Sequence, residues 1–281
     1  MKLMIERNIV ISNPETRDFL ADSFYIESTE PLPIVFFVHG YKGYKDWGAW
    51  DLMGLEFAKA GYFFVKFNFS HNGTTLEKPS EFADLEAFGL NNFTKELSDY
   101  HAVISHFTER KDVNSERIAI TGHSRGGGIT VLHAFEDERV KVLATMAGVC
   151  NFGYRFPTGD RLKEWEEKGV MYSENARTGQ QMPHDFQLYQ NYKENEERLN
   201  IQYAAQHLLE KPFLIVHPAE DETVKEKEAF LLHEWCKSSE LKMIPDANHS
   251  FGSREPWDED FLPEHLEAAV AEIIEFLNKK L

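Results

Sequence analysis

The stretch TGHSRGGG, residues 121–128, places one serine among four glycines directly after the apolar run RIAIT. RIAIT predicts a β-strand, and GGITVLHAF predicts the start of a helix. Ser124 therefore stands on a strand-to-helix turn within the pattern G-x-S-x-G. A turn this sharp strains the serine backbone and brings neighbouring segments close together. Gly122 and Gly126 permit that approach because they have no β-carbon.

The turn also places the Ser124 hydroxyl at the N-terminus of the helix. Free backbone N–H groups and the positive end of the helix dipole there favour a developing negative charge, as acyl transfer requires. The pattern alone is a weak signal, because a tight turn with a solvent-facing serine is the alternative. The strand before it and the helix after it favour a nucleophile.

Outward from this turn, eight short runs rich in β-branched or aromatic residues predict strands. They are NIVIS, DSFYIES, IVFFVH, YFFVKFNF, RIAIT, VKVLATMAG, PFLIVH and LKMIP. Most are separated, from the third onward, by segments with helical spacing at residues 47–59, 93–108, 126–135, 224–236 and 263–279. This alternation predicts a single α/β domain over residues 1–281, with an eight-stranded, mostly parallel sheet flanked by helices. The first two strands have no helix between them, which predicts an antiparallel start.

One long segment, residues 151–209, interrupts the alternation. It contains no convincing strand, and its charged and aromatic residues recur at helical spacing. A connection of this length predicts a helical cap inserted between strands 6 and 7. Three cap arginines, Arg155, Arg161 and Arg177, are candidates to bind a carboxylate. Its aromatic residues would line an acyl or aryl pocket or pack the cap onto the sheet: Phe152, Tyr154, Phe156, Trp165, Tyr172, Phe186, Tyr189, Tyr192 and Tyr203.

A serine hydroxyl becomes a good nucleophile when a base takes its proton, and the base needs a third group to orient it. PFLIVHPAEDETV places Asp221 in the loop after one strand, and LKMIPDANHSFG places His249 in the loop after the last. The order Ser, Asp, His is that of the α/β-hydrolase arrangement. Glu220 and Glu222 are alternatives for the acid, and Asp246 is close to His249 in sequence.

A tetrahedral intermediate also needs two N–H donors for its oxygen. The backbone N–H of Arg125, directly after the serine, is one candidate. The second candidate donor is the backbone N–H of Tyr41, in the loop VFFVHGYKG, with that of Lys42 as the alternative. The other interpretation of this loop is a simple turn without a role in catalysis. His39 and His217 end apolar strands and are interpreted as structural.

The motifs HGYKG, GHSRGG, AEDETV and NHSFG, in this order, resemble the α/β-hydrolase superfamily. More narrowly they resemble its dienelactone-hydrolase-like and prolyl-oligopeptidase-like esterase branch, which includes cinnamoyl esterases. The resemblance runs from about residue 34 to residue 281. It implies the α/β-hydrolase fold, Ser124 as nucleophile, His249 as base, Asp221 as its acid, and the N–H groups of Tyr41 and Arg125 as the oxyanion hole.

Two segments depart from the pattern of that branch. His217-Pro218 stands where His-Gly is common, which bears on the loop that carries Asp221. FNFSHNG replaces the more usual Asp-x-Arg-Gly-x-Gly after the fourth strand. The second departure argues against a close relation to the best known lipases and peptidases.

Composition limits which binding partners and which cellular compartment the sequence predicts. The formal net charge of -17, from 47 acidic and 30 basic residues, argues against nucleic acid or an anionic membrane as a partner. The two cysteines are far apart, and the N-terminal segment has charges within its apolar stretch. We therefore expect a cytoplasmic protein.

The predicted function is hydrolysis of carboxylic esters (EC 3.1.1) with small or aromatic acyl groups by a serine hydrolase. The reaction runs through an acyl-serine and needs no cofactor or metal. A serine peptidase or a dienelactone or lactone hydrolase on the same triad is the alternative. A catalytically silent binding protein with the hydrolase fold is the alternative of another class. The substrate would be a small-molecule ester, and the sequence predicts no oligomeric state.

Overall fold

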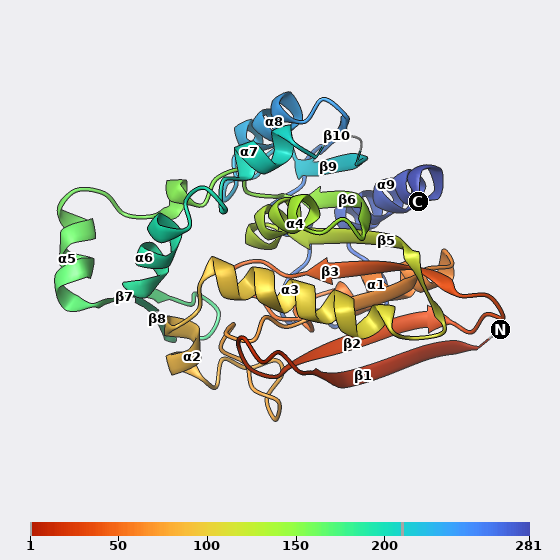
Figure 1. The fold of residues 1–281 in the computed structure, drawn as a ribbon, viewed down its shortest axis with the longest axis horizontal. Coiled ribbons are helices and arrows are strands. Elements are labelled where there is room, and N and C mark those ends of the chain that lie inside the picture. Colours follow the sequence, from red (N-terminus) through yellow and green to blue (C-terminus); the bar gives the residue numbers. More distant parts are fainter. Residues whose placement is uncertain (1, 209–210) are drawn as a thin grey trace.

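A computed structural model describes residues 2–208 and 211–281, in which an eight-stranded sheet lies between two layers of helices (Figure 1). Along the sheet the order is β1-β2-β4-β3-β5-β6-β9-β10. The β1–β2 and β2–β4 pairs are antiparallel and the others are parallel, which confirms the predicted mostly parallel sheet and its antiparallel start. The strands are β1 (Leu3–Ile11), β2 (Phe19–Ile26), β3 (Leu32–Val38), β4 (Phe63–Phe67), β5 (Val113–His123), β6 (Val140–Met146), β9 (Phe213–Pro218) and β10 (Ser239–Ile244).

The helices cover both faces of the sheet because its central strands are apolar on both sides. One face packs against α3, α4 and α8, and the other against α1 and α9. The α3 helix begins after Asn92, whose side chain accepts from the Lys95 N–H. The helices are α1 (Trp50–Lys59), α2 (Leu85–Gly89), α3 (Phe93–Thr108), α4 (Arg125–Glu136), α5 (Asp160–Lys168), α6 (Gln187–Glu194), α7 (Ile201–Gln206), α8 (Glu226–Trp235) and α9 (Glu264–Lys280), with a 3₁₀ turn at Gly153–Arg155.

The inserted cap follows β6 and extends past the carboxyl ends of the parallel strands, at the left of Figure 1. It holds α5, α6 and α7 but also an antiparallel pair, β7 (Val170–Glu174) and β8 (Gln181–Asp185). The expectation of a strand-free, wholly helical insertion was therefore wrong. The turn between the two strands is closed by N–H groups of Thr178 and Gly179 on the Asn175 carbonyl, with Gly179 at φ +71°. Residue 209, at the end of the predicted insertion, lies outside the described residues.

The cap is fastened to the body by polar contacts and by its own aromatic core. Gln180 Nε2 donates to the Phe82 carbonyl at 3.0 Å, and Asn191 Nδ2 donates to Thr94 Oγ1 at 2.9 Å. The buried Trp165 ring lies 5.4 Å from the Phe186 ring, centroid to centroid. In the described part of the chain, no helix is long and apolar enough to span a lipid bilayer.

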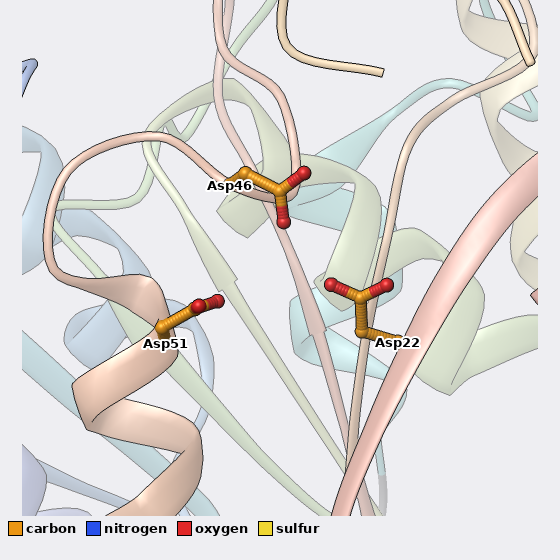
Figure 2. Close-up of side chains that lie close together, drawn as sticks. All are labelled: Asp22, Asp46 and Asp51. Carbon is orange, nitrogen blue, oxygen red and sulfur yellow. The ribbon is translucent and has the colours of Figure 1, made fainter. Parts of the chain in front are cut away.

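A partly buried charge cluster ties the β3–α1 loop to the sheet: Asp22, Lys45 and Lys66 are buried, whereas other members are partly exposed. Figure 2 shows the carboxylates of Asp22, Asp46 and Asp51, from β2, this loop and α1, facing one another. The ammonium of Lys66, on β4, lies 3.0 Å from Asp22, 2.5 Å from Asp46 and 2.6 Å from Asp51. Lys45, on the loop, lies 2.9 Å from Asp22. The loop is thus fixed to the sheet within four residues of Tyr41.

This cluster is balanced rather than acidic. Arg7, on β1, lies 3.0 Å from Asp22 and 2.6 Å from Asp51, so three cationic side chains face three carboxylates. Burial raises the pKa of Asp22, but Lys66 and Lys45 outweigh it and hold that pKa below its usual value. The cluster keeps no uncompensated charge for a divalent cation, so we do not interpret it as a metal site.

Replacing Lys66 with methionine should strongly destabilise the fold, because it removes a buried cation from the buried Asp22 carboxylate and leaves three carboxylates with two cations. We expect the free energy of unfolding in urea at pH 7 to fall by about 3–5 kcal/mol. Lys59→Met, at an exposed lysine paired only with Glu56, should change it by less than about 0.5 kcal/mol. Equal stability of the Lys66→Met variant and the wild type would contradict the role given to the cluster.

The difference between the wild type and Lys66→Met should also depend on pH. The folded-state pKa of Asp22 lies below its unfolded value of about 3.9. Its contribution to stability is therefore present above that pH and is lost as the pH falls through the lowered pKa. Urea titrations should show the two free energies of unfolding converging as the pH falls below about 4.

Candidate active site

Ser124 occupies the turn between β5 and α4, and the turn is as sharp as its sequence predicts. The serine has φ +57°, a conformation that residues with a β-carbon rarely adopt. A β-carbon on Gly122 would collide with the carbonyl oxygen of Gly126 and with Thr130 Oγ1. One on Gly126 would lie 2.5 Å from the carbonyl oxygen of His39. Both positions therefore require glycine.

The structure brings Ser124, His249 and Asp221 into one hydrogen-bond relay. His249 Nε2 lies 2.9 Å from Ser124 Oγ, and His249 Nδ1 lies 2.7 Å from Asp221 Oδ2. All three residues follow the carboxyl ends of parallel strands, β5, β9 and β10, which meet at one edge of the sheet. A relay of this geometry can take the proton of the serine hydroxyl.

Asp221 is held in place as a carboxylate. Its Oδ1 accepts from the N–H groups of Thr223 and Val224, each at 2.8 Å. Burial raises the pKa of Asp221, but the hydrogen bond from His249 and these N–H groups outweigh it, so the pKa is lowered. The alternative acids Glu220, Glu222 and Asp246 have exposed side chains, and the carboxylate that contacts His249 is that of Asp221.

Two histidines near the relay, His123 and His217, contact backbone carbonyl oxygens through their ring nitrogens. Burial, with the charge of His249 as a second cause, lowers the pKa of His123 to about 3, so its ring is neutral at pH 7. His123 Nε2 lies 2.8 Å from the His249 carbonyl oxygen, so this nitrogen carries the ring proton and donates it. His217 Nε2 likewise contacts the carbonyl oxygen of Val224 at 2.8 Å.

Two backbone N–H groups beside Ser124 are available as donors. Arg125 is the first residue of α4, so its N–H has no acceptor within the helix. In the hydrogen bonds of the described residues, the Tyr41 N–H has no acceptor either. Tyr41 and Lys42 form the centre of a turn closed by the Gly43 N–H on the Gly40 carbonyl, with Lys42 at φ +55°. A β-carbon on Gly40 would lie 2.8 Å from Ser124 Cβ, so this turn packs directly against the serine.

A mostly apolar cavity of about 340 Å³ opens beside Ser124 under the cap. Two of the predicted cap aromatics, Phe152 and Phe156, line it; Tyr154, Tyr172 and Tyr203 are exposed. Sequence reasoning missed several lining residues because they are brought there by tertiary contacts alone. These are Phe93, Val149, Met171, Ser173, His184, Leu188, Thr223 and Val224.

Both arginines that line this cavity are already paired. Arg125 Nη2 lies 2.5 Å from Glu96, and Arg155 Nη2 lies 2.5 Å from Glu228. The two carboxylates compensate the two guanidinium charges. Arg161 and Arg177 are exposed and do not line the cavity. The wall of the cavity thus suits an uncharged group better than a carboxylate.

A smaller cavity of about 130 Å³ lies on the other side of Ser124. Tyr41 and Ser124 line both of these cavities, whereas His249 and Trp47 line the smaller one and not the larger. An open groove of about 760 Å³ runs along α3 and α4, but none of the relay residues lines it. The two cavities that meet at Ser124 are therefore the candidate substrate site.

Comparison with known proteins places the chain among hydrolases. The model of the prolyl oligopeptidase family matches residues 56–265, a range that includes Ser124, Asp221 and His249. No curated protein sequence matches the chain significantly.

Solved structures with this fold have low sequence identity to the chain. Est1E from Butyrivibrio proteoclasticus, with ferulic acid bound, has a TM-score of 0.72 at 18% identity over 97% of this chain and 98% of its own. A Klebsiella pneumoniae protein described as a dienelactone hydrolase has a TM-score of 0.65 at 15% identity over 99% and 100% of the two chains. The acylaminoacyl peptidase of Pyrococcus horikoshii has a TM-score of 0.68 at 18% identity over 100% of this chain and 42% of that chain. These similarities establish the α/β-hydrolase fold.

The contact between Gly40 and Ser124 can be tested directly. Gly40→Ala should push the Tyr41 turn away from the serine and lower hydrolase activity by about a hundredfold, since displacements near 1 Å cost that much. Glu167→Ala is the control, because the side chain of Glu167 is exposed on α5 of the cap. Full activity of a folded Gly40→Ala variant would show that the turn need not touch Ser124.

Proposed function

The chain belongs to the prolyl oligopeptidase family, within the α/β-hydrolase superfamily, and we propose that it is a serine esterase with Ser124 as its nucleophile. The observation that carries the proposal is the continuous relay from Ser124 through His249 to Asp221, at the meeting point of two cavities. A tight turn with an unused serine would need neither the base nor the buried acid.

In the first half of the reaction, His249 Nε2 takes the proton of the Ser124 hydroxyl while Oγ bonds to the ester carbonyl carbon. The N–H groups of Tyr41 and Arg125 hold the oxygen that becomes negative. His249 then gives the proton to the leaving alcohol oxygen as the C–O bond breaks. Asp221 stays ionised and stabilises the imidazolium, consistent with its lowered pKa.

In the second half, water takes the place of the alcohol. His249 removes a proton from water, whose oxygen bonds to the acyl carbon, and the same two N–H groups hold the oxyanion. The bond from the acyl carbon to Ser124 Oγ breaks, and His249 returns its proton to the serine. The acid is released and the starting state is restored.

We assign the two parts of the ester from the positions of the two cavities. The leaving oxygen must receive its proton from His249, so we place the alcohol in the smaller cavity, which both Ser124 and His249 line. The acyl group then occupies the 340 Å³ cavity under the cap. Its apolar side chains and paired arginines favour an uncharged acyl group with an aromatic or medium-length aliphatic chain. The ferulic acid bound by the similar Est1E, itself an aromatic acid, supports this substrate class.

Hydrolysis of p-nitrophenyl esters, from acetate to octanoate with a cinnamate, tests the proposal. We expect turnover by the wild type and a loss of about 10⁴-fold or more in Ser124→Ala, because no other group can form the acyl intermediate. Asp221→Asn should also lose about 10⁴-fold, whereas Glu222→Gln, at the exposed neighbour, should keep full activity. Wild-type turnover of aminoacyl amides without turnover of esters would instead identify a peptidase.

The acyl assignment can be tested by filling the larger cavity. Leu188, on α6, lines that cavity and not the smaller one. Leu188→Trp should therefore lower kcat/KM for the cinnamate and octanoate by about tenfold or more while leaving that for the acetate nearly unchanged. Equal losses on all esters, or a loss that follows the size of the alcohol, would reverse the assignment.

A further inference from the structure

The side chain of Tyr41 reaches out of its loop and ends in the cap. Its hydroxyl lies 2.8 Å from Ser173 Oγ, on β7, and 2.7 Å from His184 Nε2, on β8. Ser173 Oγ and His184 Nε2 lie 3.0 Å apart, so the three groups form a closed hydrogen-bonded triangle. The residue proposed to donate its N–H to the oxyanion is thus fastened by its hydroxyl to the inserted segment.

The cap side of this triangle is rigidly built. β7 and β8 pair in register, with Met171 opposite His184. The indole N–H of the buried Trp165 donates to the His184 carbonyl oxygen at 2.7 Å. The His184 ring is buried and lies 5.5 Å from the Phe88 ring of α2, centroid to centroid. The histidine is therefore a fixed point for the hydroxyl of Tyr41.

The next residue along the loop is attached to the same hairpin. Lys42 Nζ donates to the Glu174 carbonyl oxygen, at the end of β7, at 2.6 Å. Lys42 is also the residue at φ +55°, a backbone conformation that costs free energy in residues other than glycine. Contacts to the cap on both central residues of the turn would offset that cost.

We infer that His184 and Ser173 are positioning residues that act through the hydroxyl of Tyr41 to keep its backbone N–H aimed at the reacting carbonyl oxygen. The inference rests on the proposed function, because it concerns the oxyanion donor of that reaction. The cap then has a second role beside lining the acyl cavity: it completes the oxyanion hole only while β7 and β8 are docked on the loop.

Short substrates separate this role from substrate binding. The methyl group of p-nitrophenyl acetate is too small to span the acyl cavity to the cap strands, so losses on this ester cannot come from lost acyl contacts. We expect Tyr41→Phe and His184→Leu each to lower kcat/KM for the acetate by about tenfold, below the loss of about 10²- to 10³-fold for removing a donor entirely. The double variant should lose no more kcat/KM than either single variant, because both substitutions break the same hydrogen bond between Tyr41 and His184.

Rescue and control variants complete the design. His184→Gln keeps a hydrogen-bonding atom near the position of Nε2 and should recover most of the activity that His184→Leu loses. Tyr172→Phe removes an exposed hydroxyl from the same hairpin and should behave as the wild type. Wild-type kcat/KM in Tyr41→Phe, or fully additive losses in the double variant, would overturn the inference.

Hydrogen exchange of the loop gives a measurement independent of activity. The peptide covering residues 39–45 should exchange faster in Tyr41→Phe and His184→Leu than in the wild type, His184→Gln and Tyr172→Phe. Unchanged exchange in every variant would overturn the connection itself. If the wild type hydrolyses no ester while this exchange pattern appears, the proposed function fails and the connection between cap and loop stands.

Discussion

The turn at Ser124 is the constraint on which the rest of the site depends. The serine has φ +57°, and the turn exists only because Gly122 and Gly126 let two carbonyl-bearing segments pass where β-carbons would collide. This turn places the hydroxyl at the start of α4 and at the carboxyl edge of the sheet. The loops after β3, β9 and β10 end at the same edge, so Tyr41, Asp221 and His249 reach the serine.

Charged side chains around the site are already paired with side chains of opposite charge in the absence of a substrate. Arg125 and Arg155 line the larger cavity already paired with Glu96 and Glu228, which leaves an electrically balanced wall. The charge cluster around Asp22 and Lys66, with three charges of each sign, fixes the β3–α1 loop, which carries Tyr41, to the sheet. A neutral cavity suits an ester whose only new charge appears on the carbonyl oxygen during the reaction.

The sheet and the relay residues could be predicted from the sequence because local patterns indicate them. These patterns are the apolar runs, the serine flanked by glycines, and the loops after successive strands. It missed the β7–β8 hairpin because VMYSE and QMPHD are short, half-exposed runs whose polar residues resemble helix surface. It also missed Ser173 and His184 because their role depends on a contact to Tyr41 across 132 and 143 residues. Long-range contacts of this kind follow from how the cap docks, which no local pattern specifies.

Labelling with a fluorophosphonate, followed by peptide mass analysis, tests whether Ser124 is an activated nucleophile, because the reagent reacts with a serine activated by a relay and an oxyanion hole. We expect a single adduct, on the peptide that contains Ser124. We also expect no adduct in Ser124→Ala and slower labelling in His249→Ala. A folded protein that takes up no reagent, or takes it up on another residue, would show that Ser124 is not the nucleophile.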